Sequence, residues 1–181
     1  GDTSMFKPRI QRRHWLGCAI ATGLTLMAGL HNSPAWALDA PQGRVILTVS
    51  GKIGQTNRDG KAVFDLAMLQ KLPQHTFTTR TPWEPEPVQF SGPVRKDVLP
   101  ALKASGSQLT AVALNDYKIS LPVTDATQFG VMLAYRMNDE VLSVRTKGPL
   151  FVIYPFDSQA ELKSAKYYER SIWQLKAIDV Q

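Results

Sequence analysis

The residues of this chain that could do chemistry are aromatic and polar side chains that stand beside turns, prolines and glycines. Aromatic rings stack on flat heterocycles. A carboxylate accepts N–H bonds from the edge of an amino-pyrimidinone, and basic side chains donate to a carbonyl or a phosphate. These residue types together predict a binding site for a planar, hydrogen-bonding ring. The candidate residues for this ligand are Trp83, Asn115, Asp116, Tyr117, Arg145, Lys147, Tyr154 and Trp173.

Several of these residues also have a purely structural interpretation. The pair Asn115-Asp116 is of a kind that turns favour for backbone reasons. Trp173 opens an expected terminal strand, where a tryptophan commonly belongs to the core. Arg145 and Lys147 fit a solvated loop as well as they fit a ligand site. The residues by themselves leave both interpretations open.

Common catalytic groups are nearly absent from the sequence. The chain has one cysteine, Cys18, and His75 is its one histidine after residue 37. One histidine cannot supply the two or three imidazoles of a zinc site. The sequence also has no G-x-S-x-G elbow, P-loop or G-x-G-x-x-G motif. Glu84 and Glu86 lie in a proline-rich loop, which is more typical of solvated carboxylates than of an acid–base pair. The sequence therefore favours binding over turnover.

The N-terminal segment has the pattern of a secretory signal peptide over residues 1–37. An apolar run from Trp15 to Leu30 leads to Ala35-Trp36-Ala37, small residues at the −3 and −1 positions of a cleavage site. Four basic side chains precede the run: Lys7, Arg9, Arg12 and Arg13. An uncleaved anchor and a twin-arginine signal are the alternatives, and export by the Sec route to the periplasm is favoured. Met5 is the expected start, with residues 1–4 as an addition ahead of it.

Length and composition predict a single globular domain at residues 38–181. The chain has 181 residues, of which 44% are apolar and 20% charged, values that argue against disorder and against several membrane spans. The formal net charge of +6 includes the basic head of the signal, and falls to +3 without residues 1–37. That modest charge removes the support for a nucleic-acid partner.

The hydrophobic patterns predict an α+β fold with a mixed β-sheet and short helices. Leu150–Tyr154 is apolar without a break, which predicts a central strand buried on both faces. Pro100 stands inside one expected helix. Helices are expected at Phe64–Leu72 and Arg95–Ser105, with a turn or short helix at Asp125–Phe129. Strands are expected at Arg44–Val49, His75–Thr81, Gln89–Gly92, Leu109–Leu114, Tyr117–Leu121, Val131–Met137, Leu150–Tyr154 and Ser171–Val180.

Several runs, taken in order, resemble the molybdopterin-binding domain of the sulfite oxidase family. They are Leu114-Asn115-Asp116-Tyr117, Leu133–Glu140, Gly148-Pro149-Leu150 and Ser171–Leu175. The resemblance extends over nearly all of residues 38–181. It implies a single compact, sulfite oxidase-like domain of mixed α+β structure, in agreement with the patterns above.

The sequence departs from that family where the family binds its metal. The family's enzymes hold molybdenum through a pterin dithiolene and one cysteine, which would fall near Thr78–Thr81, and this chain has no cysteine there. The chain also has Trp173-Gln174 where the family usually carries a Lys-Trp pair. The resemblance therefore implies a pterin ligand, with the molybdenum cofactor not expected.

A small branch of the family resembles this chain in size and lacks the same cysteine. The resemblance implies a non-enzymatic periplasmic protein that senses a reduced pterin. Its partner would be the periplasmic domain of an inner-membrane cyclic di-GMP enzyme of the GGDEF/EAL type. On this hypothesis Trp83 and a tyrosine stack on the ring. Asp116 accepts from the amino-pyrimidinone edge with support from Asn115, and Arg145 polarises the ring carbonyl. A molybdopterin-dependent oxidoreductase or subunit, and a ligand-free adaptor for protein contacts, are the alternatives.

Overall fold

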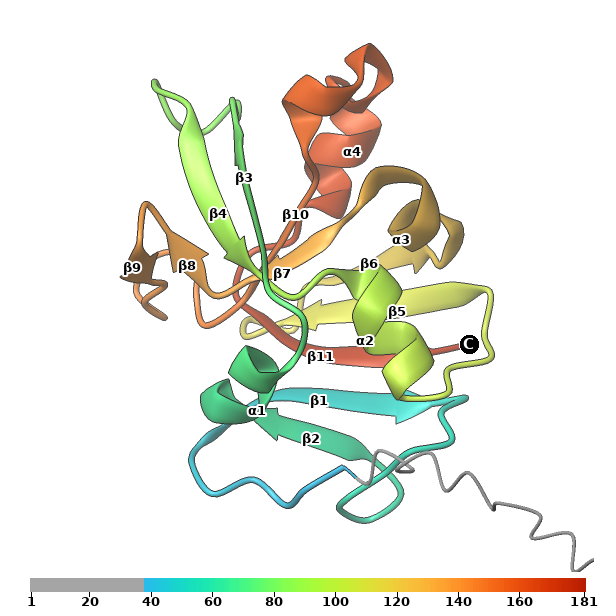
Figure 1. The fold of residues 1–181 in the computed structure, drawn as a ribbon. Helices are drawn as coiled ribbons and strands as arrows, with labels where there is room; N and C mark the ends of the chain where they lie inside the picture. The colour runs from blue at the N-terminus through green and yellow to red at the C-terminus, as the bar shows by residue number, and fades with distance from the viewer. Residues whose placement is uncertain (1–37) are drawn as a thin grey trace, which may run out of the picture. The chain divides into compact units, whose positions relative to one another are not determined.

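The computed structural model describes residues 38–181, which form eleven strands and a few short helices (Figure 1). The signal peptide expected at residues 1–37 lies outside the described residues and stays a prediction. The helices are α1 (Leu66–Lys71), α2 (Arg95–Ala101), α3 (Thr124–Phe129) and α4 (Ala165–Arg170), with 3-10 turns η1 (Phe156–Ser158) and η2 (Ala160–Leu162). The strands are β1 (Val45–Gly51), β2 (Ala62–Asp65), β3 (His75–Thr79), β4 (Val88–Gly92), β5 (Gln108–Ala113), β6 (Lys118–Pro122), β7 (Met132–Ala134), β8 (Arg136–Met137), β9 (Glu140–Val141), β10 (Phe151–Ile153) and β11 (Leu175–Val180).

The largest sheet has five strands in the order β2-β1-β11-β5-β6. Its middle strand is the last one in the chain, because β11 pairs in parallel with β1 and antiparallel with β5. The β5–β6 hairpin closes through a turn at residues 114–117, as the sequence predicts. Trp173 and Gln174 directly precede β11, so this sheet holds them next to that hairpin turn. The backbone bond from the Leu114 N–H to the Gln174 carbonyl, 2.9 Å long, joins the two segments.

Two smaller sheets complete the fold, one of four strands in the order β3-β4-β8-β9 and one formed by β10 and β7. In Figure 1 the β3–β4 hairpin and α4 rise on the same side of the five-stranded sheet. A continuous apolar core joins the sheets, with Phe64 of β2, Phe90 of β4 and Phe151 of β10 at most 1% exposed. The α+β class predicted from the sequence is confirmed.

Four of the expected elements differ from the structure. Phe64 and Asp65 end strand β2, and the helix begins only at Leu66. The segment Val131–Met137 forms two strands in different sheets, β7 and β8. The segment Leu150–Tyr154 is fully buried, as expected, but it is not central in a large sheet. Its strand β10 pairs with β7 in a two-stranded sheet, so its burial comes from packed side chains rather than from strands on both sides. Strand β11 begins at Leu175, so Trp173 lies ahead of it.

Asp65 is the N-cap residue of helix α1, and its buried carboxylate accepts three backbone N–H groups. Its Oδ1 accepts from Met68, and its Oδ2 accepts from Gln42 and Gly43, each at 2.8 Å. The first bond is an N-cap of the helix, and the other two fix the chain that leads into β1. These hydrogen bonds, from Gly43 above all, hold the pKa of Asp65 below its ordinary value.

Replacing Asp65 with alanine is expected to lower the free energy of unfolding at neutral pH by roughly 1–2 kcal/mol, the range of a lost N-cap. Because the folded-state pKa is lowered, this stabilisation is present above the ordinary carboxyl pKa and is lost as the pH falls through the folded value. Urea unfolding at pH 7 and below about pH 3 measures it. The difference between the wild type and the variant should shrink in acid, whereas Glu86→Ala, in an exposed loop, should cost little at either pH.

Candidate functional site

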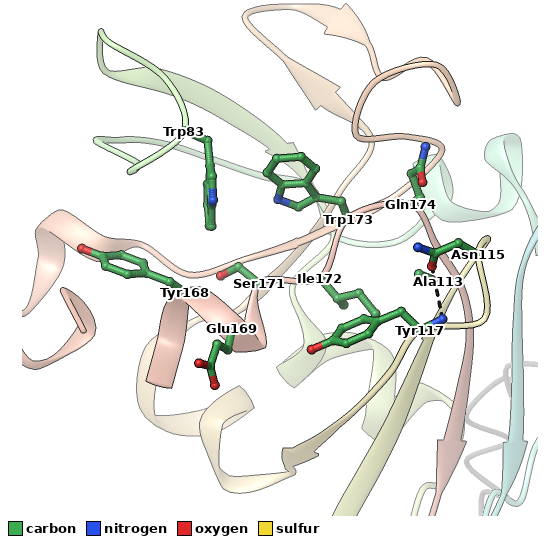
Figure 2. A pocket seen from close by; sticks show the side chains of 10 residues that line it. All are labelled: Trp83, Ala113, Asn115, Tyr117, Tyr168, Glu169, Ser171, Ile172, Trp173 and Gln174. Atoms are coloured by element: carbon green, nitrogen blue, oxygen red, sulfur yellow. Dashed lines mark hydrogen bonds between the residues drawn. The ribbon is translucent and has the colours of Figure 1, made fainter. Parts of the chain in front are cut away.

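A pocket of about 300 Å³ opens where four segments of the chain meet (Figure 2). The segments are the β3–β4 loop, the β5–β6 turn, the end of α4 and the residues before β11. The volume is at the lower end of the range for small-molecule sites, roughly 300–1,000 Å³. The pocket is lined by Trp83, Ala113, Asn115, Tyr117, Tyr168, Glu169, Ser171, Ile172, Trp173 and Gln174. Four residues expected from the sequence are therefore brought together here: Trp83, Asn115, Tyr117 and Trp173.

Two tryptophans form the aromatic wall of this pocket. The rings of Trp83 and Trp173 meet edge to face, with centroids 5.6 Å apart and planes at 86°. Trp83 also packs against the buried Phe151 at 5.8 Å and against Tyr168, another residue of the lining, at 6.1 Å. Trp173 is 38% exposed, so an aromatic surface remains open for a ligand ring. Figure 2 shows both indoles at the pocket, with Tyr168 and Tyr117 on its other sides.

An ion pair holds the Trp83 loop in place. The Lys147 ammonium bonds to the Glu84 carboxylate, and the same ammonium lies 4.8 Å from the centroid of the Trp173 ring. The Lys147 side chain is 13% exposed. Lys147 was expected to donate to the ligand, but it does not line the pocket. It links the loop of Trp83 to Trp173 through Glu84 and a cation–π contact.

The β5–β6 turn brings only part of its expected residues to the pocket. The Asn115 Oδ1 accepts the Tyr117 N–H at 3.1 Å, which leaves the amide N–H₂ group as a donor. Asp116 has a positive φ of 65°, and its carboxylate bonds to the Lys176 ammonium at 2.6 Å. That bond to Lys176 lowers the pKa of Asp116. Asp116 does not line the pocket, because this left-handed turn directs its side chain to Lys176 on β11.

The acidic residue among the lining residues is Glu169, near the end of α4, and its side chain is exposed at the pocket margin. Glu169 is not among the candidate residues chosen from the sequence, whereas its neighbour Tyr168 belongs to the aromatic residues that the sequence places near a site. The signal that could have found Glu169 is the run from Ser164, a good N-cap residue, through helix formers to Arg170. In that helix Tyr167 is buried, which leaves Tyr168 and Glu169 on the more open side.

Tyr154 lies in the core rather than in the pocket. It is 0% exposed, and its hydroxyl donates to the Asp125 Oδ2 at 2.8 Å. Burial raises the pKa of Tyr154 well above its ordinary value. The Arg170 guanidinium donates to the same Asp125 oxygen at 2.8 Å. Arg170 directly follows Glu169, so this buried contact anchors the end of α4 that carries the pocket carboxylate.

Arg145 lies on the exposed loop before β10, also outside the pocket lining. Its backbone N–H donates to the Ser143 Oγ at 3.1 Å. This loop contacts the site through Gln174, whose side-chain amide donates to the Val144 carbonyl at 2.8 Å. Four of the residues expected from the sequence therefore do not line the pocket: Asp116, Arg145, Lys147 and Tyr154.

Comparison with known proteins places this domain in a known family. Residues 44–170 match the family described as the oxidoreductase molybdopterin binding domain. No curated protein sequence matches the chain. Among solved structures, the sulfane dehydrogenase SoxCD of Paracoccus pantotrophus is similar, with a TM-score of 0.56 and 16% sequence identity. The similarity covers 74% of this chain and 37% of that one, so the chain spans well under half of SoxCD's matched chain. At this identity the likeness shows a common fold.

The donor set around the pocket fits a pterin ring better than a molybdenum centre. Within residues 38–181 there is no cysteine and no cluster of three or more His, Cys, Asp or Glu side chains that could hold a metal ion. At the end of β3, where the resemblance places the family's cysteine, the Thr79 hydroxyl accepts the Asp157 N–H at 2.9 Å. A hydroxyl engaged in this way does not replace a soft thiolate ligand. The described residues thus do not fit a cysteine-ligated molybdenum, whereas the aromatic walls fit a flat ring.

Proposed function

Because the chain belongs to the oxidoreductase molybdopterin-binding domain family, we propose that it is a non-enzymatic pterin-binding protein of the periplasm. The observation that carries the proposal is the pocket walled by Trp83 and Trp173 and bordered by the Glu169 side chain, in a chain of this family. A pterin is a flat ring with an amino-pyrimidinone edge. Aromatic walls and a carboxylate at one margin suit both of its features.

The residues take different roles from those first expected. Trp83 and Trp173 stack on the ring or meet it edge to face. Glu169 takes the role first given to Asp116 and accepts N–H bonds from the ring edge, while the free Asn115 amide donates to the ring carbonyl. These contacts orient the ring and exclude water from its faces. They include no group poised to take or give a proton in a reaction, which favours binding over catalysis.

The proposed output is regulation of an inner-membrane cyclic di-GMP enzyme through its periplasmic domain. Apolar side chains at the pocket rim support a protein contact there. Tyr117 is 51% exposed and Trp173 is 38% exposed. Leu114 and Val144, which are 39% and 41% exposed, lie beside them. The Leu114 N–H donates to the Gln174 carbonyl, and the Gln174 side-chain amide donates to the Val144 carbonyl. Exposed apolar clusters mark interaction surfaces. A bound ring would become part of that rim and shift the population of the form that docks. Among residues 38–181 no helix is long and apolar enough to cross a membrane.

A molybdopterin-dependent oxidoreductase or its subunit is the second candidate, favoured by the family match itself. It requires a molybdenum ligand other than a cysteine of residues 38–181. A protein that binds no heterocycle at all would instead be an adaptor.

The proposal is tested by titrating the purified protein with a tetrahydropterin and following tryptophan fluorescence. We expect saturable quenching at one ligand per chain. In cells, the wild-type chain should change the cyclic di-GMP level when pterin synthesis is altered, and the Trp173→Ala chain should not. A protein that binds no reduced or oxidised pterin would refute pterin sensing. Ligand binding without any change in cyclic di-GMP would refute the regulatory part alone.

A further inference from the structure

We infer that the pocket selects heterocycles by charge and edge, taking unphosphorylated rings with a 2-amino-4-oxopyrimidine edge and rejecting their phosphorylated forms. This inference rests on the proposed function and names the ligand class of the same site. It follows from which charged side chains line the pocket and which are turned away from it.

Among the lining residues, Glu169 is the one with a formal charge at neutral pH. The others are aromatic, amide, hydroxyl or aliphatic side chains, so within the described part of the chain no basic side chain lines this pocket. Figure 2 shows the Glu169 carboxylate at one margin, with the Tyr117 hydroxyl pointing toward the same side. A site built to hold a phosphate would be expected to present arginine or lysine donors.

Three basic residues that adjoin the lining are paired with carboxylates, whereas Lys118, which follows Tyr117, is exposed and has no carboxylate partner among the described residues. Lys147, over the Trp173 ring, bonds to Glu84. Arg170, next to Glu169, bonds to Asp125 at 2.8 Å.

The third such cation is Lys176 on β11, two residues after Gln174. Lys176 bonds to Asp116 at 2.6 Å. Among the lining residues themselves the formal charge is that of Glu169. A phosphate on a ligand tail in this pocket would then lie within the screening length of that carboxylate, about 10 Å at 0.1 M salt.

The same carboxylate distinguishes rings by the hydrogen-bonding groups on their edge. In a 2-amino-4-oxopyrimidine the ring N3–H and the 2-amino group lie side by side, and two carboxylate oxygens can accept both. A ring with a carbonyl at position 2 presents an acceptor there instead. That acceptor would face the carboxylate, and one of the two bonds would be replaced by a repulsion.

The experiment compares two matched ligand pairs on the full chain by isothermal titration calorimetry. The first pair is neopterin and neopterin triphosphate, and the second is pterin and lumazine, which has a carbonyl in place of the 2-amino group. We expect neopterin to bind at least about tenfold more tightly than neopterin triphosphate, and pterin at least about tenfold more tightly than lumazine. The affinity difference between neopterin and its triphosphate should become smaller as salt is added.

Variants assign the selectivity to Glu169. Glu169→Gln should reduce the affinity difference within both ligand pairs, because it removes the charge and one acceptor while keeping the shape of the side chain. Glu161→Gln, an exposed carboxylate of η2, and Arg145→Ala should leave both affinity differences unchanged.

Equal or tighter binding of the phosphate or of lumazine would overturn this inference, as would unchanged affinity differences in Glu169→Gln. If pterins bind without these preferences, the inference fails and the proposed function stands. If none of the four compounds binds, the inference fails, and the proposed function fails with it when a tetrahydropterin does not bind either.

Discussion

Replacing Trp173 with alanine is expected to weaken pterin binding by up to about 100-fold, the range of a lost stacking contact between an aromatic side chain and a base. Trp173 supplies half of the indole wall and meets Trp83 at 5.6 Å. Trp173 is 38% exposed, so part of its aromatic surface is open to a ligand in the pocket, while the rest packs on its neighbours. The loss should therefore appear in ligand affinity as well as in folding stability. Fluorescence titration with a tetrahydropterin, beside urea unfolding, measures the two effects.

Two control variants make this result specific. Trp173→Phe keeps an aromatic ring and should retain most of the affinity. Phe77→Ala truncates a half-buried aromatic of β3 that packs on Phe90 outside the pocket, so it should change stability and leave affinity unchanged. An alanine at position 173 that binds the pterin as tightly as the wild type would contradict the placement of the ligand at this pocket.

Replacing Asp125 with alanine is expected to lower the free energy of unfolding by roughly 3–5 kcal/mol, the cost of breaking a buried ion pair from one side. Asp125 is 3% exposed, and one of its oxygens accepts both the Tyr154 hydroxyl and the Arg170 guanidinium. Arg95 lies buried beside this group, where burial lowers its pKa. Without the Asp125 carboxylate, positive charge would remain in the core with no counter-ion.

Urea unfolding of Asp125→Ala and Tyr154→Phe measures this cost. The phenylalanine variant removes one hydroxyl donor and should cost about 1 kcal/mol. Since Arg170 anchors the end of α4, Asp125→Ala should also weaken pterin binding under conditions where the variant stays folded. A loss of stability no larger for Asp125→Ala than for Tyr154→Phe would show that the ion pair with Arg170 contributes little.

The class of the fold and the hairpin of β5 and β6 could be predicted from the sequence because their signals are local. Alternating apolar residues on both sides of Asn115-Asp116 specify two strands and a turn. The uninterrupted apolar run Leu150–Tyr154 predicts burial and is indeed buried. It does not reveal how many strands lie beside it, since helices and loops can cover a short strand as well as a sheet can.

The candidate site was predicted in part, because residue types reveal chemistry more readily than direction. Trp83 and Trp173 are almost a hundred residues apart in the chain, and their aromatic character alone placed both in the set. Asp116 was chosen as the carboxylate, but its direction depends on a positive φ and on Lys176 across the sheet. Glu169 lies on α4, whose end is joined to α3 by the Arg170–Asp125 ion pair, a contact that no local pattern records.

Native mass spectrometry with molybdenum analysis, on the protein purified from periplasm, tests the central claim most directly. The account predicts a pterin mass at close to one per chain, without molybdenum, and its loss in Trp173→Ala. Molybdenum bound with a pyranopterin dithiolene would contradict the account and would make the oxidoreductase the correct function.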